Sequence, residues 1–147
     1  MRYYSKEIVE YLCGGNPLRG ITHLEAHLLD TVVLPKGVSQ VKFPVIESDR
    51  DGNYDPETGR FNAKATRTYQ VSVCALFEDI PIGQRFWIGI YKNGGAFAVD
   101  TKNGGAQASQ VTRSLWLNAG DYLEVYAYCD GGARLNPTNY ATWLTVT

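Results

Sequence analysis

Apolar and polar residues alternate along most of the chain after residue 31. The clearest stretch runs from Tyr69 to Phe77, where Tyr69, Val71 and Val73 are separated by polar neighbours. Successive side chains of a strand point to opposite faces, so this alternation predicts a strand with one face toward a core. Similar patterns predict strands at Thr31–Leu34, Val41–Ile46, Phe86–Tyr91, Val111–Leu117, Tyr122–Cys129 and Tyr140–Val146.

Turn residues separate these stretches. The segment Asp51–Phe61 (DGNYDPETGRF) predicts a double turn, because glycine takes positive φ without steric cost and the Asp-Pro pair favours a turn. Asn93–Gly94 is the dipeptide that a tight hairpin prefers, and Asn118–Asp121 predicts a second hairpin. Strands joined by hairpins, without helices between them, predict an all-β fold: an antiparallel jelly-roll sandwich of about ten strands.

The first part of the chain follows a different pattern. Apolar residues recur at helical spacing in Ser5–Leu12 and again in Thr22–Leu29, which predicts two short helices. Helices this short are marginal in water by themselves, so they must dock onto something larger. The sequence therefore predicts an N-terminal attachment segment over residues 1–33 and a jelly-roll domain over residues 34–147. The predicted attachment residues are Ile8, Val9, Leu12, Leu24 and Leu28.

Composition narrows the classes of function. The chain has 147 residues and a net charge of -1, with no long run of either sign. Nucleic-acid binding and a basic membrane-binding patch are therefore not expected. Neither a signal peptide nor a membrane-spanning stretch is recognised, so membrane insertion is not expected. Cys13, Cys74 and Cys129 are expected to be free thiols in a reducing cytosol, with a Cys74–Cys129 disulfide as the alternative.

Two groups of side chains are candidates for metal binding. His23, His27 and Asp30 would share one face of the predicted helix, but they lack the zinc-protease pattern and a fourth ligand. An acidic loop offers several oxygens, yet it lacks the glycine and the closing glutamate of an EF-hand. We therefore expect no metal or other cofactor, with calcium in this loop as the alternative. The weak calcium candidates are Asp49, Asp51 and Asp55.

No catalytic constellation is recognised in the sequence. The two histidines lie together outside the predicted jelly roll, and no serine or cysteine lies in a nucleophile elbow. Carboxylate pairs occur only in predicted turns. The chain is therefore not expected to be an enzyme.

The predicted strand Tyr122–Cys129 has two different faces. Leu123 and Val125 face the core, so the tyrosines that alternate with them face the other way. A tyrosine-rich face is too apolar for an ordinary solvent surface. It indicates either a subunit interface or a second sheet packed over it.

Several motifs follow one another in a fixed order. They are Gly52–Phe61 (G-x-Y-D-x-x-T-G-x-F), Tyr69-x-Val71, Tyr91–Gly94, Leu115–Asp121 and Tyr140–Leu144. Together they resemble the globular head domain of complement component one, subcomponent q, which belongs with tumour necrosis factor. The resemblance implies a jelly roll that assembles as a homotrimer around aromatic and aliphatic side chains. The candidate interface residues are Tyr69, Tyr122, Tyr126, Tyr128 and Tyr140.

The sequences of three segments are similar to those of this domain in bacterial and bacteriophage proteins, where the domain forms the tip of a fibre. These segments are Asn53–Asp55, Ile90–Gly94 and Leu117–Tyr122. The resemblance implies a structural virion protein: a trimeric head or tail fibre, or a capsid decoration protein, assembled in the host cytoplasm. Its N-terminal segment would fasten it to other virion proteins, and its jelly roll would project for host attachment.

Host attachment implies a surface ligand, either a glycan or a protein. Tryptophan rings suit such a surface because they stack on sugars and pack at interfaces. The alternative function is a non-viral, soluble, trimeric recognition module that binds a protein or a glycan. The candidate ligand residues are Trp87, Trp116 and Trp143.

Overall fold

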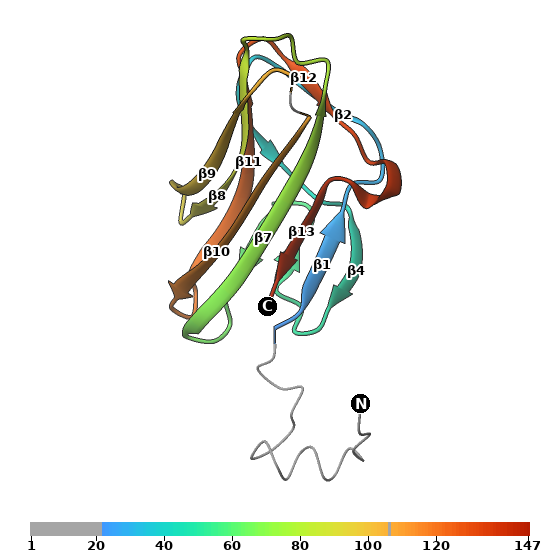
Figure 1. The fold of residues 1–147 in the computed structure, drawn as a ribbon. Coiled ribbons are helices and arrows are strands. Elements are labelled where there is room, and N and C mark those ends of the chain that lie inside the picture. The colour runs from blue at the N-terminus through green and yellow to red at the C-terminus, as the bar shows by residue number, and fades with distance from the viewer. Residues whose placement is uncertain (1–21, 106) are drawn as a thin grey trace, which may run out of the picture.

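The protein folds into two antiparallel sheets packed face to face, as the computed structural model shows for residues 22–105 and 107–147 (Figure 1). The first sheet contains β2 (Val32–Leu34), β12 (Ala133–Leu135), β7 (Arg67–Glu78), β13 (Trp143–Val146), β1 (Leu24–His27) and β4 (Val45–Asp49) in this order, with β10 (Ala108–Leu117) paired to β7. The second contains β5 (Tyr54–Asp55), β6 (Arg60–Asn62), β11 (Tyr122–Cys129), β8 (Arg85–Lys92) and β9 (Gly95–Asn103), with β3 (Gly37–Val41) paired to β11. These sheets confirm the all-β jelly-roll prediction.

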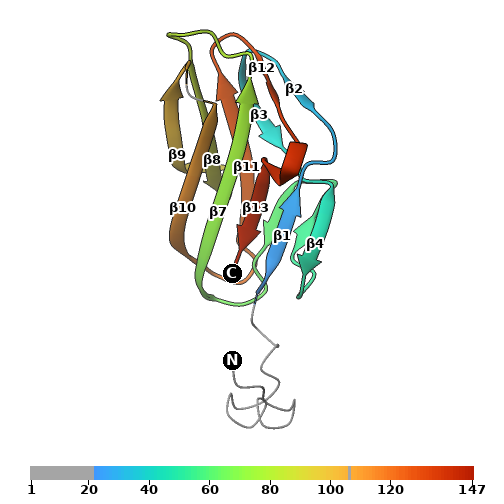
Figure 2. The ribbon, with the colours of Figure 1, turned by 45° about the vertical axis from the view of Figure 1, so that its right-hand side comes forward.

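Within the described residues, the helical structure is a single 3-10 turn, η1 (Thr138–Tyr140). Figure 2, turned from the first view, shows this turn beside β1 and β13. No helix in the described part of the chain is long and apolar enough to cross a membrane.

The long central strand β7 behaves as its alternation predicts. Tyr69, Val71 and Val73 are buried, whereas Gln70 and Ser72 between them point outward. β7 pairs with β10 over nearly its whole length and with β13 over its middle. β7 therefore contributes side chains both to the core and to the outer surface of the first sheet.

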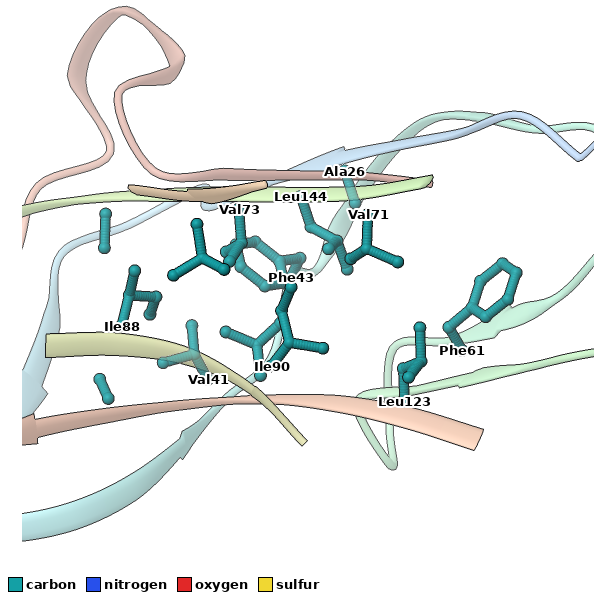
Figure 3. Packing of buried hydrophobic residues seen from close by; sticks show 14 of the residues in the cluster. Ala26, Val41, Phe43, Phe61, Val71, Val73, Ile88, Ile90, Leu123 and Leu144 are labelled. Carbon is teal, nitrogen blue, oxygen red and sulfur yellow. The ribbon is translucent and has the colours of Figure 1, made fainter. Parts of the chain in front are cut away.

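The hydrophobic core fills the space between the sheets (Figure 3). Val73 and Leu144 of the first sheet face Ile88 and Ile90 of the second, with Phe43 packed between them. Because each sheet contributes alternate side chains to this one core, the opposite faces of both sheets remain free to meet solvent or a partner.

The predicted turns have the expected backbone. Gly52 and Gly59 take φ of 64° and 71°, and a short hairpin, β5–β6, lies within the predicted double turn. Asn93 and Gly94 take φ of 50° and 84° and connect β8 to β9. Burial raises the pKa of Tyr54 to about 12, and the Tyr54 hydroxyl accepts a hydrogen bond from the Phe43 amide at 3.0 Å.

The predicted helix at Thr22–Leu29 is wrong, because Leu24–His27 is strand β1, paired to β13 on one side and β4 on the other. Leu24 and Leu28 are 0% and 2% exposed, so they belong to the sandwich core and not to an attachment surface. The sandwich therefore begins before residue 34. Residues four apart share a face in a strand as well as in a helix, so the spacing of Leu24 and Leu28 did not distinguish the two.

Other boundaries also differ from the predictions. The stretch Val41–Ile46 is divided between β3 and β4, and the closing strand starts at Trp143 and not at Tyr140. The predicted helix at Ser5–Leu12, with attachment residues Ile8, Val9 and Leu12, lies outside the described residues. Cys74 and Cys129 are free thiols on different sheets, as expected, and burial raises the pKa of both.

Candidate functional site

Large aromatic side chains lie together on the outer face of the second sheet. Trp87 of β8 lies opposite Tyr128 of β11, with ring centroids 5.6 Å apart and planes within 14°. Tyr91 lies 6.4 Å from Trp87 and 4.3 Å from Tyr126, again between centroids. We call the following residues the aromatic face: Trp87, Tyr91, Tyr122, Tyr126 and Tyr128.

Gly89 explains how these rings come together. It lies between Trp87 and Tyr91 on β8 and pairs with Tyr126 on β11. A Cβ at Gly89 would come within 2.6 Å of the Val99 side chain and 3.2 Å of the Trp87 ring. The missing side chain therefore leaves room for its large neighbours to close over the backbone.

Charged groups flank the aromatic face at both ends. At one end the Arg60 guanidinium lies over the Tyr122 ring, 4.1 Å from its centroid, and 3.5 Å from the buried carboxylate of Glu124. At the other end the Tyr128 hydroxyl donates to Asp130 at 2.5 Å. That hydrogen bond raises the pKa of Tyr128 and lowers the pKa of Asp130.

A hollow of about 330 Å³ lies at this second end of the aromatic face. It combines ring surfaces with a cation and a hydroxyl, a mixture typical of sites that bind polar ligands with apolar faces. The residues that line the hollow are Val38, Arg85, Trp87, Thr101 and Tyr128.

The outer face of the first sheet differs because it carries no charged side chain between Thr68 and Leu76 of β7 or on the neighbouring outward positions of β10 and β13; the first charge along β7 is Glu78, at its end. Charged residues make up 20% of the chain, so their absence from such a broad surface is notable. At its centre, the hydroxyls of Ser72 and Thr112 are 2.7 Å apart. We call these residues the uncharged face: Thr68, Gln70, Ser72, Cys74 and Leu76 of β7, Ala108, Gln110, Thr112, Ser114 and Trp116 of β10, and Trp143 and Thr145 of β13.

In the structure, the predicted interface residues and the predicted ligand residues do not form two separate surfaces. Tyr69 is 1% exposed and packs edge-on against Phe61 in the core, so its prediction as an interface residue is wrong. Trp87 joins the predicted interface tyrosines on the aromatic face, whereas Trp116 and Trp143 belong to the uncharged face on the opposite sheet. Tyr140 lies at the margin of this opposite sheet, beside His27.

His27 lies on β1 with both ring nitrogens directed at acceptors. Nδ1 is 2.9 Å from the Leu28 carbonyl and Nε2 is 2.7 Å from Glu47 Oε1. Both hydrogen bonds form only when the imidazole carries two protons and is therefore charged. Burial opposes that charge, but the bonds to Glu47 and Leu28 outweigh it, so the pKa of His27 is raised.

We expect this contact to make stability depend on pH. Because the folded-state pKa of His27 exceeds its ordinary value of about 6.5, its contribution is present below that value and lost as pH rises through the folded pKa. Between about pH 6 and about pH 8, the melting temperature should therefore fall by more in the wild type than in His27→Gln. His23→Gln is the matched control, since His23 is more exposed. An equal fall in wild type and His27→Gln would contradict the assignment.

The side chains predicted as metal ligands near β1 do not point toward a common centre. His23 contacts Glu25, and His27 contacts Glu47, while Asp30 lies beyond the end of β1. Among the described residues, no group of three or more histidine, cysteine, aspartate or glutamate side chains is placed to hold a metal ion.

The acidic loop is organised by Asp49. Its Oδ1 accepts a hydrogen bond from the Asn53 amide and its Oδ2 accepts one from the Tyr54 amide, both at 2.9 Å. Asp55 Oδ1 accepts a hydrogen bond from the Glu57 amide at 2.9 Å in the same way. The carboxylates of the calcium candidates Asp49 and Asp55 therefore accept hydrogen bonds from backbone amides in turns.

Replacing Asp49 with alanine is expected to destabilise the fold by about 1–2 kcal/mol, because two backbone amides lose their acceptor. The control is Asp51→Ala, since the Asp51 side chain has no such role and only its carbonyl accepts from Lys64. Urea unfolding followed by circular dichroism measures both. Equal midpoints for Asp49→Ala and Asp51→Ala would show that the carboxylate does not organise the turn.

The architecture defines a class: a two-sheet antiparallel jelly roll with one core and two free outer faces. No protein-family model and no curated protein matches the chain in sequence. Solved structures do match. The globular domain of zebrafish complement 1qA protein is 14% identical, with a TM-score of 0.63, and the match covers 86% of this chain and 95% of that one.

Two matches come from tumour necrosis factor relatives. Murine APRIL at pH 8.0 is 14% identical with a TM-score of 0.66, covering 85% of this chain and 96% of that one. Eiger TNF from S. frugiperda is 12% identical with a TM-score of 0.65, covering 85% and 90%. The chain thus has the jelly-roll fold shared by complement C1q and tumour necrosis factor, which confirms the fold that the sequence motifs implied.

Proposed function

We propose that this chain is a homotrimeric recognition domain that associates through its uncharged face and binds a surface ligand on its aromatic face. The uncharged face is the observation that carries the proposal. The centres of protein interfaces are depleted in charge and enriched in aromatic residues, and this face combines Trp116 and Trp143 with uncharged polar side chains. The shared jelly-roll fold supports self-association in general.

Self-association would leave the aromatic face pointing outward on every copy. A weak contact repeated on one rigid assembly gains avidity when the target surface is itself repetitive. A glycan surface has this property, and sugar rings present apolar faces that stack on aromatic side chains. Around the hollow, Arg85, Thr101 and Asp130 supply the donors and acceptors that sugar hydroxyls require.

Native mass and glycan binding test this proposal together. Light scattering coupled to size exclusion should give about three times 16.3 kDa, or about 49 kDa. On an array of microbial surface glycans, Trp87→Ala should lose binding while keeping the wild-type mass. Phe97→Ala is the control, because Phe97 is a partly exposed aromatic residue of β9 outside the aromatic face. Wild-type glycan binding that survives Trp87→Ala would reject the aromatic face as the ligand site.

We further propose that this recognition domain is a bacteriophage structural protein, either a head or tail fibre or a capsid decoration protein. The support comes from three segments whose sequences are similar to those of fibre-tip domains: Asn53–Asp55, Ile90–Gly94 and Leu117–Tyr122. Leu24 and Leu28 are buried in the core and cannot contact another protein. We therefore propose that the residues preceding β1 attach the domain to other virion proteins. Mass spectrometry of purified virions tests this; absence from particles would favour a non-viral recognition module.

A further inference from the structure

A pocket of about 390 Å³ opens on the first sheet, between β1, β4, β13 and the η1 turn. Its volume is within the range of pockets that hold small ligands. Its lining combines the aromatic rings of Tyr140 and Trp143 with the carboxylates of Glu25 and Glu47. The pocket lies on the opposite sheet from the aromatic face and shares Trp143 and Thr145 with the uncharged face, so in the proposed trimer it lies at the edge of the subunit interface.

The charge of this pocket favours a cation. Glu25 and Glu47 contribute two carboxylates, and the residues that line the pocket include no lysine or arginine. His27 is the one lining residue with a cationic form; paired with Glu47, its charge offsets one of the two carboxylates and leaves the pocket with a net negative charge. Glu47 Oε2 and the Glu25 carboxylate thus remain to accept from a ligand, although His23 lies 3.2 Å from Glu25 Oε1.

The backbone beside the pocket is strained. Asn139 and Tyr140 have φ of 54° and 56°, which side chains larger than glycine seldom adopt. In this conformation the Tyr140 ring stands edge-on to His27, with centroids 4.4 Å apart, although the Tyr140 side chain is largely exposed. Strained residues of this kind gather at binding sites, where the surrounding structure holds them in place.

We propose that this pocket binds an alkylammonium cation, as presented by a lysine side chain of a protein partner or by a free polyamine. Aromatic ring faces attract ammonium groups and also cover methylene chains. The carboxylates of Glu25 and Glu47 accept the ammonium hydrogens, which gives charge-assisted hydrogen bonds. This site is independent of the proposed glycan site, because the two use different sheets and different chemistry.

Titration of the isotope-labelled full chain with small probes tests the proposal. Cadaverine and N-acetyl-lysine methylamide should shift the Trp143 indole resonance in a saturable way, whereas the neutral n-pentanol should not. Tighter binding of the lysine derivative points to a protein side chain, and tighter binding of cadaverine points to a polyamine. No saturable shift with either amine, or an equal shift with n-pentanol, overturns the proposal.

Two substitutions, each with a matched control, separate binding from folding. Tyr140→Gly removes the ring and relieves the backbone strain, so the melting temperature should hold or rise while amine affinity falls about tenfold. Asn139→Gly is the matched control, because it relieves the same kind of strain and keeps the ring. Glu47→Gln should also weaken binding, whereas Glu57→Gln in the β5–β6 turn should not. Unchanged affinity in both Tyr140→Gly and Glu47→Gln overturns the site, whatever the result on glycan arrays.

Discussion

Replacing Thr112 with glutamate is expected to convert the assembled protein into single chains of 16.3 kDa. Thr112 lies at the centre of the uncharged face, paired with Ser72. In a threefold assembly, each copy would bring a carboxylate into the uncharged face, which holds no cation to pair with it. Burying an unpaired charge costs several kcal/mol for each copy, which exceeds what a modest interface supplies.

The fold of the protomer should survive this change, because Thr112 is exposed and surface substitutions seldom alter stability by more than about 0.5 kcal/mol. Thr101→Glu is the matched control, an exposed threonine on β9 of the other sheet. Light scattering coupled to size exclusion gives the mass, and far-ultraviolet circular dichroism confirms the fold. A trimeric Thr112→Glu protein would place the subunit interface elsewhere, and a monomeric wild type would remove it.

Replacing Gly104 with alanine is expected to destabilise the protomer by about 3 kcal/mol. A Cβ at this position would lie 1.8 Å from the Pro81 carbonyl oxygen and 2.5 Å from its carbon. Both are backbone atoms, so no side-chain rotation relieves the clash. The Gly104 amide also donates to the Gln84 carbonyl at 2.7 Å, which holds the end of β9 against the β7–β8 connection.

Gly95→Ala is the control for this prediction. Gly95 also lacks positive φ, and the nearest atom to its Cβ would be the Lys92 carbonyl oxygen at an ordinary 3.7 Å. Chemical unfolding of both variants measures the difference in free energy. Similar unfolding midpoints for Gly104→Ala and Gly95→Ala would show that the β7–β8 connection shifts to accept the Cβ without loss of stability.

The sequence contained most of the fold because local patterns agree with tertiary pairing. In β7 and β11 the period-two alternation alone separates core from surface, and Asn93–Gly94 fixes the hairpin between β8 and β9. The error at Leu24–His27 has a physical cause: a strand this short offers too few residues to establish its period. Its identity comes from pairing with β13 and β4, which are distant in sequence.

The candidate sites were less accessible to sequence reasoning. The tyrosines of β11 were expected to face outward, but the aromatic face also needs Trp87 and Tyr91, whose positions follow from the β8–β11 register. The uncharged face was visible in the polar residues that alternate along β7 and β10. It became a single surface only through their pairing. Tyr69 shares its parity with Val71, so alternation already placed it in the core.

The position of β13 between β7 and β1 has a consequence during synthesis on the ribosome. Every strand from β1 to β12 leaves the ribosome before β13, yet β1 and β7 each depend on β13 to cover an edge. Until then the nascent sandwich displays two unpaired strand edges, which are templates for aggregation between neighbouring chains. We therefore expect truncation before Trp143 to leave both edges exposed and to yield inclusion bodies.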